Sequence, residues 1–356
     1  MTPSSTTGPK IRKIIYTLFF LLMTVLILTN SQKSTYYALN GLNLWFTKMI
    51  PSLLPFMILS GIMVRLQLTE GFVSIIHPLL YPVWRVRKNV TYAMIMGFFC
   101  GFPMGARVTC DLLERDMITE KEAGFLLAFC NNIGPVYFTS FVLPLLRRRL
   151  VLPYLLGMYG VPFVYGLLLR HTAYRDITSD LSKIQNKKHA MLSCNTQSKE
   201  LTAASSQATK SSYSLLEQID EAITSSIQGI MSLGGYMILF NLFNLVPAFI
   251  TDFLLQVAEE RSFTPVHQLF VEALPSLTAP ILEITGGLGM LGTGMPLYSL
   301  LLLPFGGLSC IAQTYSIIRR SDLSIHTYVY HKLILTGITA LYYAGWQFFF
   351  PGSFLA

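Results

Sequence analysis

The stretch from Gly97 to Pro135 decides the fold, and it reads GFFCGFPMGARVTCDLLERDMITEKEAGFLLAFCNNIGP. A glycine-interrupted apolar run leads into Arg107 and a short charged helix, and a second apolar run then carries the segment NNIGP at 131–135 in its interior. Asparagine pairs, Gly-Pro breaks and a lone arginine are costly in a membrane, because their polar groups need partners inside the protein. These residues therefore indicate a functional site.

The composition predicts an all-α polytopic membrane protein. Of the 356 residues, 52% are hydrophobic and 12% are charged, against about 25% charged in an ordinary soluble domain. The net charge of +8 is typical of basic cytoplasmic loops, and a nucleic-acid partner is not expected because the basic residues lie at the ends of apolar runs and in one linker. The five scattered cysteines and six dispersed histidines argue against a disulfide framework, a metal site or a cofactor site.

The distribution of apolar runs predicts four regions. Residues 1–38 form a tail and a first transmembrane helix, 39–170 a first membrane repeat, 171–214 a polar and largely disordered linker, and 215–356 a second membrane repeat. The run Arg147-Arg148-Arg149 is interpreted as a topology signal or a lipid-headgroup contact.

Within the first repeat, the residue pattern predicts interrupted elements. We expect an interfacial helix over 42–50, a break at Pro51–Pro55, a re-entrant hairpin over 89–106 and a span over 123–146 that is broken at NNIGP. Thr119 and Glu122 predict a capping box at the start of that span.

The second repeat is expected to contain a helix over 215–228, spans over 229–246 and 333–350, and two short interfacial pieces over 248–255 and 263–274. The uncharged, glycine-rich run Ile284–Ile318 predicts a broken helix followed by a second hairpin.

The two halves resemble each other. A shift of 206 residues aligns Gly101 with Gly307, and a shift of 180 residues aligns Phe56–Ser60 with Tyr236–Phe240. This pattern predicts two pseudo-symmetric, inverted repeats with a binding site at the midplane, where broken helices meet.

Four motifs carry a resemblance to a known family: GFPMGAR at 101–107, FCNNIGP at 129–135, EITGG at 283–287 and FGGLS at 305–309. They resemble the YlbJ family of sporulation integral membrane proteins, also called the stage V sporulation protein VV family. That family belongs to the nucleoside-recognition (Gate) superfamily and is similar in architecture to concentrative nucleoside transporters. The resemblance runs from about Leu42 to the C-terminus and leaves out the linker.

The resemblance implies a function in endospore formation. It implies a multi-pass protein of the outer forespore membrane that moves dipicolinate, a small aromatic dianion, from the mother cell toward the forespore. An intramembrane enzyme is not expected, because the sequence shows no nucleophile–base pair or metal motif. The expected partners are the lipid bilayer, the dipicolinate anion and a coupling ion, either a proton or sodium; a homo-oligomer is compatible with the sequence. The alternative is a non-transporting membrane scaffold or gating component of a sporulation complex.

A site for a small dianion needs a fixed cation and hydrogen-bond donors, which breaks in helices supply through free backbone amides. The candidate substrate-binding residues are Gly101, Pro103, Gly105, Arg107, Asn131, Asn132, Gly134, Gly306, Gly307, Ser309 and Gln313.

Glu283 and Thr285 are assigned to ion coupling, or to a charge pair between Glu283 and Arg107. Three alternatives stay open. Arg107 is equally consistent with an interfacial residue that reaches water, the asparagine pair with a helix–helix hydrogen bond, and Glu283 with an exposed interfacial charge.

Overall fold

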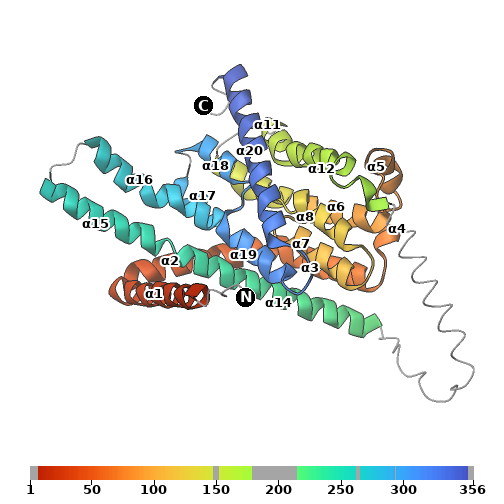
Figure 1. Cartoon of the computed structure of the whole chain (residues 1–356), viewed down its shortest axis with the longest axis horizontal. Helices are drawn as coiled ribbons and strands as arrows, with labels where there is room; N and C mark the ends of the chain where they lie inside the picture. The colour runs from red at the N-terminus through yellow and green to blue at the C-terminus, as the bar shows by residue number, and fades with distance from the viewer. Residues whose placement is uncertain (1–6, 147–151, 179–214, 262–264, 293, 352–356) are drawn as a thin grey trace, which may run out of the picture.

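The computed structural model describes residues 7–146, 152–178, 215–261, 265–292 and 294–351, and these are helical apart from short turns and connections (Figure 1). The helices of the first half are α1 (Thr7–Thr29), α2 (Ser31–Leu44), α3 (Ile50–Arg65), α4 (Thr69–Val73), α5 (His77–Trp84), α6 (Lys88–Cys100), α7 (Met104–Glu114), α8 (Glu120–Phe129), α9 (Pro135–Tyr137), α10 (Leu143–Leu145), α11 (Leu152–Leu155) and α12 (Val161–His171). Those of the second half are α14 (Leu215–Leu242), α15 (Leu245–Arg261), α16 (Pro265–Leu282), α17 (Ile284–Leu291), α18 (Pro296–Leu302), α19 (Gly307–Ile318) and α20 (Ile325–Phe349). Most of the predicted linker and the run Arg147-Arg148-Arg149 lie outside the described residues.

Five helical stretches in the described part of the chain are long and apolar enough to cross a membrane: Ile11–Thr29, Ser31–Arg65, Leu152–His171, Leu215–Val257 and Pro296–Ile318. Together with the absence of strands from the described residues, they confirm an all-α polytopic membrane protein. Helix α20 forms over the predicted last span, but its polar residues keep it out of this group of five.

The predicted break at Pro51–Pro55 is wrong, because the helix runs on from Ser31 to Arg65. A π-helical turn, Trp45–Met49, precedes Pro51, and the Ile50 amide donates to the carbonyl of Trp45, five residues back. Proline lacks an N–H and its ring collides with the carbonyl four residues earlier. The wider π turn accommodates both, so the proline stays inside a continuous helix.

Two further prolines are accommodated in the same way. The π turns Phe138–Val142 and Leu156–Gly160 each end two residues before a proline, namely Pro144 and Pro162. In both, the residue that precedes the proline donates its backbone N–H to the first carbonyl of the π turn. A π turn with a following proline is therefore a repeated element of this fold.

The two halves contain the same order of elements. In each, a long helix (α2–α3 or α14) leads through shorter or connecting helices to a pair of helices joined by a tight turn (α6–α7 or α16–α17). An interrupted helix (α8–α9 or α18–α19) and a last helix then follow. The starts of α6 and α16, and of α8 and α18, are separated by nearly the predicted shift of 180 residues and not by 206.

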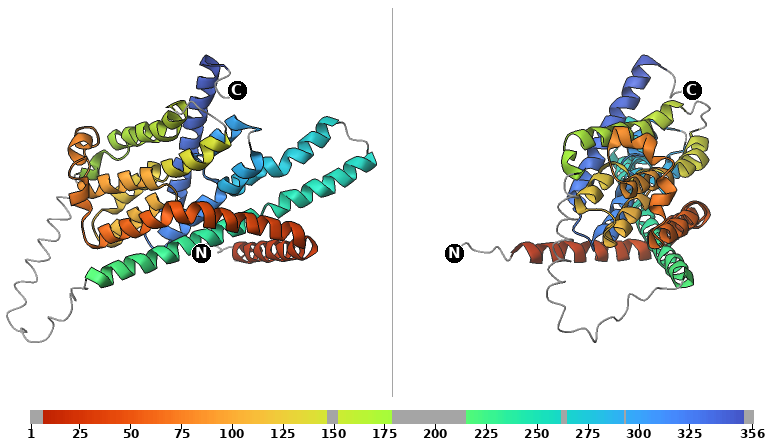
Figure 2. Two further views of the ribbon diagram at one scale, coloured as in Figure 1. Left: turned by 180° about the vertical axis from the view of Figure 1, so that it is seen from behind. Right: turned by 90° about the vertical axis from the view of Figure 1, so that its right-hand side faces the viewer.

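The second half differs from its prediction in three details. One helix, α14, replaces the expected helix and separate span, and the expected short interfacial pieces are the longer α15 and α16. These two helices pack together and extend away from the other helices (Figures 1 and 2). The order within 284–318 is also reversed: α17 folds back, with Gly287 against Pro280, before the interrupted helix α18–α19 begins.

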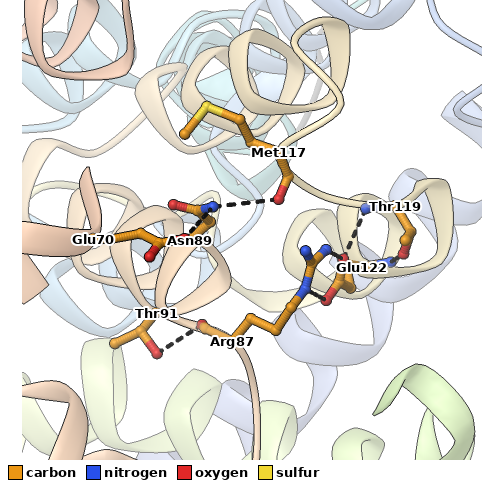
Figure 3. A network of polar contacts seen from close by, with 7 residues as sticks. All are labelled: Glu70, Arg87, Asn89, Thr91, Met117, Thr119 and Glu122. Atoms are coloured by element: carbon orange, nitrogen blue, oxygen red, sulfur yellow. Dashed lines mark hydrogen bonds and ion pairs between the residues drawn. The ribbon is translucent and has the colours of Figure 1, made fainter. Parts of the chain in front are cut away.

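The predicted capping box is confirmed at the start of α8. The Glu122 amide donates to the Thr119 hydroxyl at 3.2 Å, and the Thr119 amide donates to the Glu122 carboxylate at 2.7 Å. The same carboxylate is fully buried and forms an ion pair with Arg87, at the start of α6 (Figure 3). Because Arg87 supplies two nitrogens to the two oxygens of Glu122, the pair fixes α6 against α8.

Aromatic packing surrounds the end of α8. Trp84 stacks on Phe129, with ring centroids 5.3 Å apart and an interplanar angle of 13°. Gly166 of α12 faces the other side of this cluster, and a Cβ there would overlap the Phe129 ring at 2.5 Å from Cε2. This core holds the last turn of α8 rigidly in place just before the chain leaves the helix at Cys130.

Candidate functional site

The turn of one helix pair meets the break of the neighbouring interrupted helix in each half. Gly101, with φ of +84°, begins the α6–α7 turn, and a Cβ at this position would overlap the amide nitrogen of Gly134. Gly307, with φ of +78°, begins α19, and its Cβ would lie 3.1 Å from the amide nitrogen of Ile284. Only glycine combines this backbone conformation with such close approach at low cost. The predicted breaks at these positions are therefore places where two backbones touch.

The two amide side chains of the first break connect it to the second half. Asn131 donates from Nδ2 to the hydroxyls of Thr314 in α19 and Tyr328 in α20, both at 3.0 Å. Asn132 donates from Nδ2 to the carbonyl of Phe129. Both asparagines are buried, and Asn131 Oδ1 has no hydrogen-bond partner among the described residues. Helix–helix hydrogen bonding, one of the two alternatives for the asparagine pair, is thus present. The Oδ1 atom of Asn131 remains available as an acceptor.

A buried lysine is the central residue that the sequence analysis missed. Lys332 of α20 is 3% exposed, and its amine donates to the carbonyl of Asn131 and, at 3.2 Å, to Oδ1 of Asn132. The amine also lies 4.1 Å from the ring centroid of Phe102. The predicted last span covers 333–350 and leaves Lys332 outside it, whereas α20 begins at Ile325, with Ser324 as its N-cap. The Ser324 cap was the available signal that the lysine lies inside the helix.

Glu283 forms the turn between α16 and α17. Its carboxylate accepts hydrogen bonds from the Thr285 amide at 3.0 Å, from the Gly286 amide at 2.6 Å and from Asn241 Nδ2 at 3.0 Å. Because Glu283 is 2% exposed, the exposed-interface alternative does not hold. Its hydrogen-bond donors are all uncharged, so the carboxylate is held by dipoles rather than by a cation.

A cavity of about 50 Å³ lies between these elements. Among its lining residues are Phe102, Gly134, Tyr137, Glu283, Thr285 and Gln313. A buried water needs roughly 10–15 Å³ of such space, so in this conformation the cavity has room for a few waters and not for an organic substrate.

Arg107 lies apart from that cavity. Its guanidinium donates to the carbonyl and hydroxyl of Ser225 in α14, at 2.8 and 2.6 Å, and lies 3.9 Å from the Asp111 carboxylate. The expected pair between Arg107 and Glu283 is absent, because each has other partners. Arg107 and Pro103 line a second cavity of about 240 Å³.

Gln313 lines both cavities and donates from Nε2 to the Ser309 hydroxyl at 2.9 Å. It stands between the second cavity and the central one. Two of the glycine candidates contribute close backbone contacts: Gly105 lies against the Cys130 carbonyl, and Gly306 lies against the Phe102 ring. The structure thus brings candidates of both halves together around the central cavity, whereas Arg107 and Pro103 line the second cavity.

Comparison with known proteins gives one relative. The chain is 26% identical over 342 residues to the sporulation integral membrane protein YlbJ of Bacillus subtilis (strain 168), a match that covers 91% of this chain and 80% of that protein. No protein-family model matches the chain. No solved structure matches it. The likeness to YlbJ supports the assignment of the chain to the YlbJ family, and with the membrane-spanning helices it fits a membrane role in sporulation.

Proposed function

We propose, from the premise that the chain is a YlbJ-family sporulation membrane protein, that it transports a small organic anion. The anion suggested by the family resemblance is dipicolinate, carried across the outer forespore membrane. The observation that carries the proposal is Lys332, a buried amine at the break of an interrupted helix and beside the central cavity. Ionisable groups inside a membrane protein are expensive and mark substrate or ion pathways.

We propose further that the two halves are repeats. The matching order of long helix, helix pair, interrupted helix and last helix supports this, as does the contact of a turn with a break in each half. Transporters built from inverted repeats bind substrate near the midplane, between such interrupted helices.

In this proposal the central cavity is too small for the substrate in the present conformation. A carboxylate of the substrate replaces the waters and binds Lys332, while Asn131 and Asn132 supply neutral polar groups. Arg107 and Gln313 then belong to the approach, because they line the second cavity and Gln313 also lines the central one. Entry requires the turn at Gly101 to move away from the break at Gly134.

Glu283 and Thr285 keep their proposed role in ion coupling. A dianion in the cavity would be repelled by a charged Glu283, so binding is favoured when a proton or a sodium ion neutralises that carboxylate. The uncharged donors around Glu283 leave its charge uncompensated, which supports this role.

Uptake of labelled dipicolinate into proteoliposomes, with and without proton or sodium gradients, tests the proposal. We expect uptake by the unchanged protein and at least a tenfold loss in Lys332→Met. The control is Lys48→Met, because Lys48 is an exposed lysine on the π turn of Trp45–Met49. Uptake that Lys332→Met retains would contradict the role of this amine. No uptake by the unchanged protein would favour the scaffold alternative.

A further inference from the structure

We propose that the Phe102 ring is an internal gate between the central cavity and the amine of Lys332. The inference deepens the proposed function and rests on it in one respect: the central cavity must be part of the substrate path. Phe102 would then decide when an anion in the cavity meets the buried cation.

The position of Phe102 is the first observation. The residue lies in the turn between α6 and α7, and its side chain lines the central cavity. The Lys332 amine lies 4.1 Å from the centroid of the same ring, yet Lys332 is not among the residues that line the cavity. The aromatic side chain therefore contacts both the cavity and the cation, and the cation has no direct contact with the cavity.

The space beside the ring is the second observation. Gly306, with φ of +77°, faces Phe102, and a Cβ at this position would lie 2.9 Å from ring atoms Cε2 and Cζ. Any side chain at 306 would push the ring out of its present place. The Phe102 ring thus lies between the Lys332 amine of α20 and the backbone of Gly306, just before α19. A side chain of the first half therefore covers an amine of the second half.

The hydrogen bonds of the amine are the third observation. Lys332 has three N–H donors, and two acceptors face it, the Asn131 carbonyl and Asn132 Oδ1. Two rings add cation–π contacts to the amine: Phe102, with its centroid 4.1 Å away, and Tyr328, with its centroid 6.0 Å away. When the nearer ring, Phe102, leaves, that direction of the amine becomes available to a carboxylate entering from the cavity. In the closed state the Lys332 amine therefore has favourable contacts on its open sides without a bound ligand.

The test measures access to position 332 by chemical labelling. The five cysteines of the chain are replaced by serine or alanine, Lys332→Cys is introduced, and the reaction rate with an anionic methanethiosulfonate reagent is measured in proteoliposomes. We expect Phe102→Ala to raise the rate at least tenfold. Phe102→Tyr keeps the ring and should leave the rate unchanged.

Phe98→Ala is the matched control. Phe98 belongs to the same helix pair but packs against Phe129 and Phe163, with ring centroids 6.0 and 6.5 Å away, and does not line the central cavity. A second reporter, Asn132→Cys, repeats the measurement with Lys332 in place. Two outcomes would overturn the gate: rates unaltered by Phe102→Ala in both reporters, or rates raised equally by Phe98→Ala.

The labelling rates do not depend on dipicolinate, so the two proposals fail separately. Absence of dipicolinate uptake by the unchanged protein would overturn the transport proposal, while the labelling rates would still decide whether the ring shields position 332.

Discussion

Two buried charged regions of this protein are built in opposite ways. Glu122 at the start of α8 is paired directly with Arg87, and the capping box with Thr119 completes its hydrogen bonds (Figure 3). Around the central cavity, Glu283 and Lys332 each have neutral partners instead, namely amides, carbonyls and an aromatic ring. The carboxylate residue of each region is almost inaccessible to solvent: Glu122 is 0% exposed and Glu283 is 2% exposed.

The difference separates fixed charges from exchangeable ones. A bidentate ion pair holds two helices in one arrangement, and breaking it leaves a buried charge without a partner. A charge that is held only by dipoles can accept a new partner of opposite sign, because no existing ion pair has to be broken. Four substitutions test whether this contrast between the Arg87–Glu122 pair and the central charges is real.

The largest effect is expected for Arg87→Gln. The substitution leaves the fully buried carboxylate of Glu122 without its cation and should lower the free energy of unfolding by about 3 kcal/mol or more. Denaturation of the purified protein in detergent measures the loss, and uptake per folded molecule should stay unchanged. If Arg87→Gln is no less stable than Glu283→Gln, the contrast between the two regions fails.

Gly101→Ala comes next, because it disturbs the contact on which the central region is built. The positive φ of Gly101 and the overlap of a Cβ with Gly134 should together lower the free energy of unfolding by about 2–3 kcal/mol. Gly71→Ala is the control, since nothing lies within 4 Å of a Cβ there. Thermal unfolding in detergent compares the two variants. Equal midpoints would show that the turn yields more easily than its geometry indicates.

Lys332→Met should reduce stability less than it reduces uptake. The Asn131 carbonyl and Asn132 Oδ1 lose a donor, which is expected to lower the free energy of unfolding by about 1–2 kcal/mol, while uptake falls at least tenfold. The two effects are measured on one preparation by unfolding and by proteoliposome uptake. A loss of uptake no greater than the loss of folded protein would make Lys332 a structural residue, like Arg87.

Glu283→Gln should have the smallest effect on stability. The glutamine Oε1 can take the place of the oxygen that accepts from the Gly286 amide and Asn241 Nδ2, and only the hydrogen bond from the Thr285 amide is lost, so we expect the free energy of unfolding to fall by about 1 kcal/mol. What should change is the response of uptake to proton or sodium gradients, measured with and without each gradient. A gradient response equal to that of the unchanged protein would remove Glu283 from coupling.

Local interruptions were predictable from the sequence, whereas long-range partners were not. Glycine at 101 and the segment NNIGP at 131–135 indicate breaks because of their own backbone preferences, and Thr119 indicates its cap for the same reason. Lys332 and its contact with the Asn131 carbonyl join residues about 200 positions apart. No local pattern encodes such a contact, so the sequence alone does not predict that Lys332 reaches the first half.

Arg107 is the opposite case, a residue that the sequence marks as a candidate but whose partner it does not predict. Its charge in an apolar neighbourhood marks it as a candidate, but its partner, Ser225, is set by the packing of α7 and α14 on the same helices, α3 and α19, and not by the GFPMGAR motif. The prolines show a further limit. Pro51 alone predicts a broken helix, and only the geometry of the preceding turn reveals that the helix continues.

Those proline-linked turns also affect how the chain can gain or lose residues. A π turn contains about one residue more than an α turn, which rotates everything after it by about 100° relative to an uninterrupted helix. The buried faces of α3, such as Leu53 and Met57, are therefore in phase with α2 only because of the extra residue in Trp45–Met49. A single-residue deletion there would turn these side chains toward lipid. In related chains that lack the extra residue, we expect the apolar positions of the following helix to be shifted by one residue in the sequence, so that they still face the core.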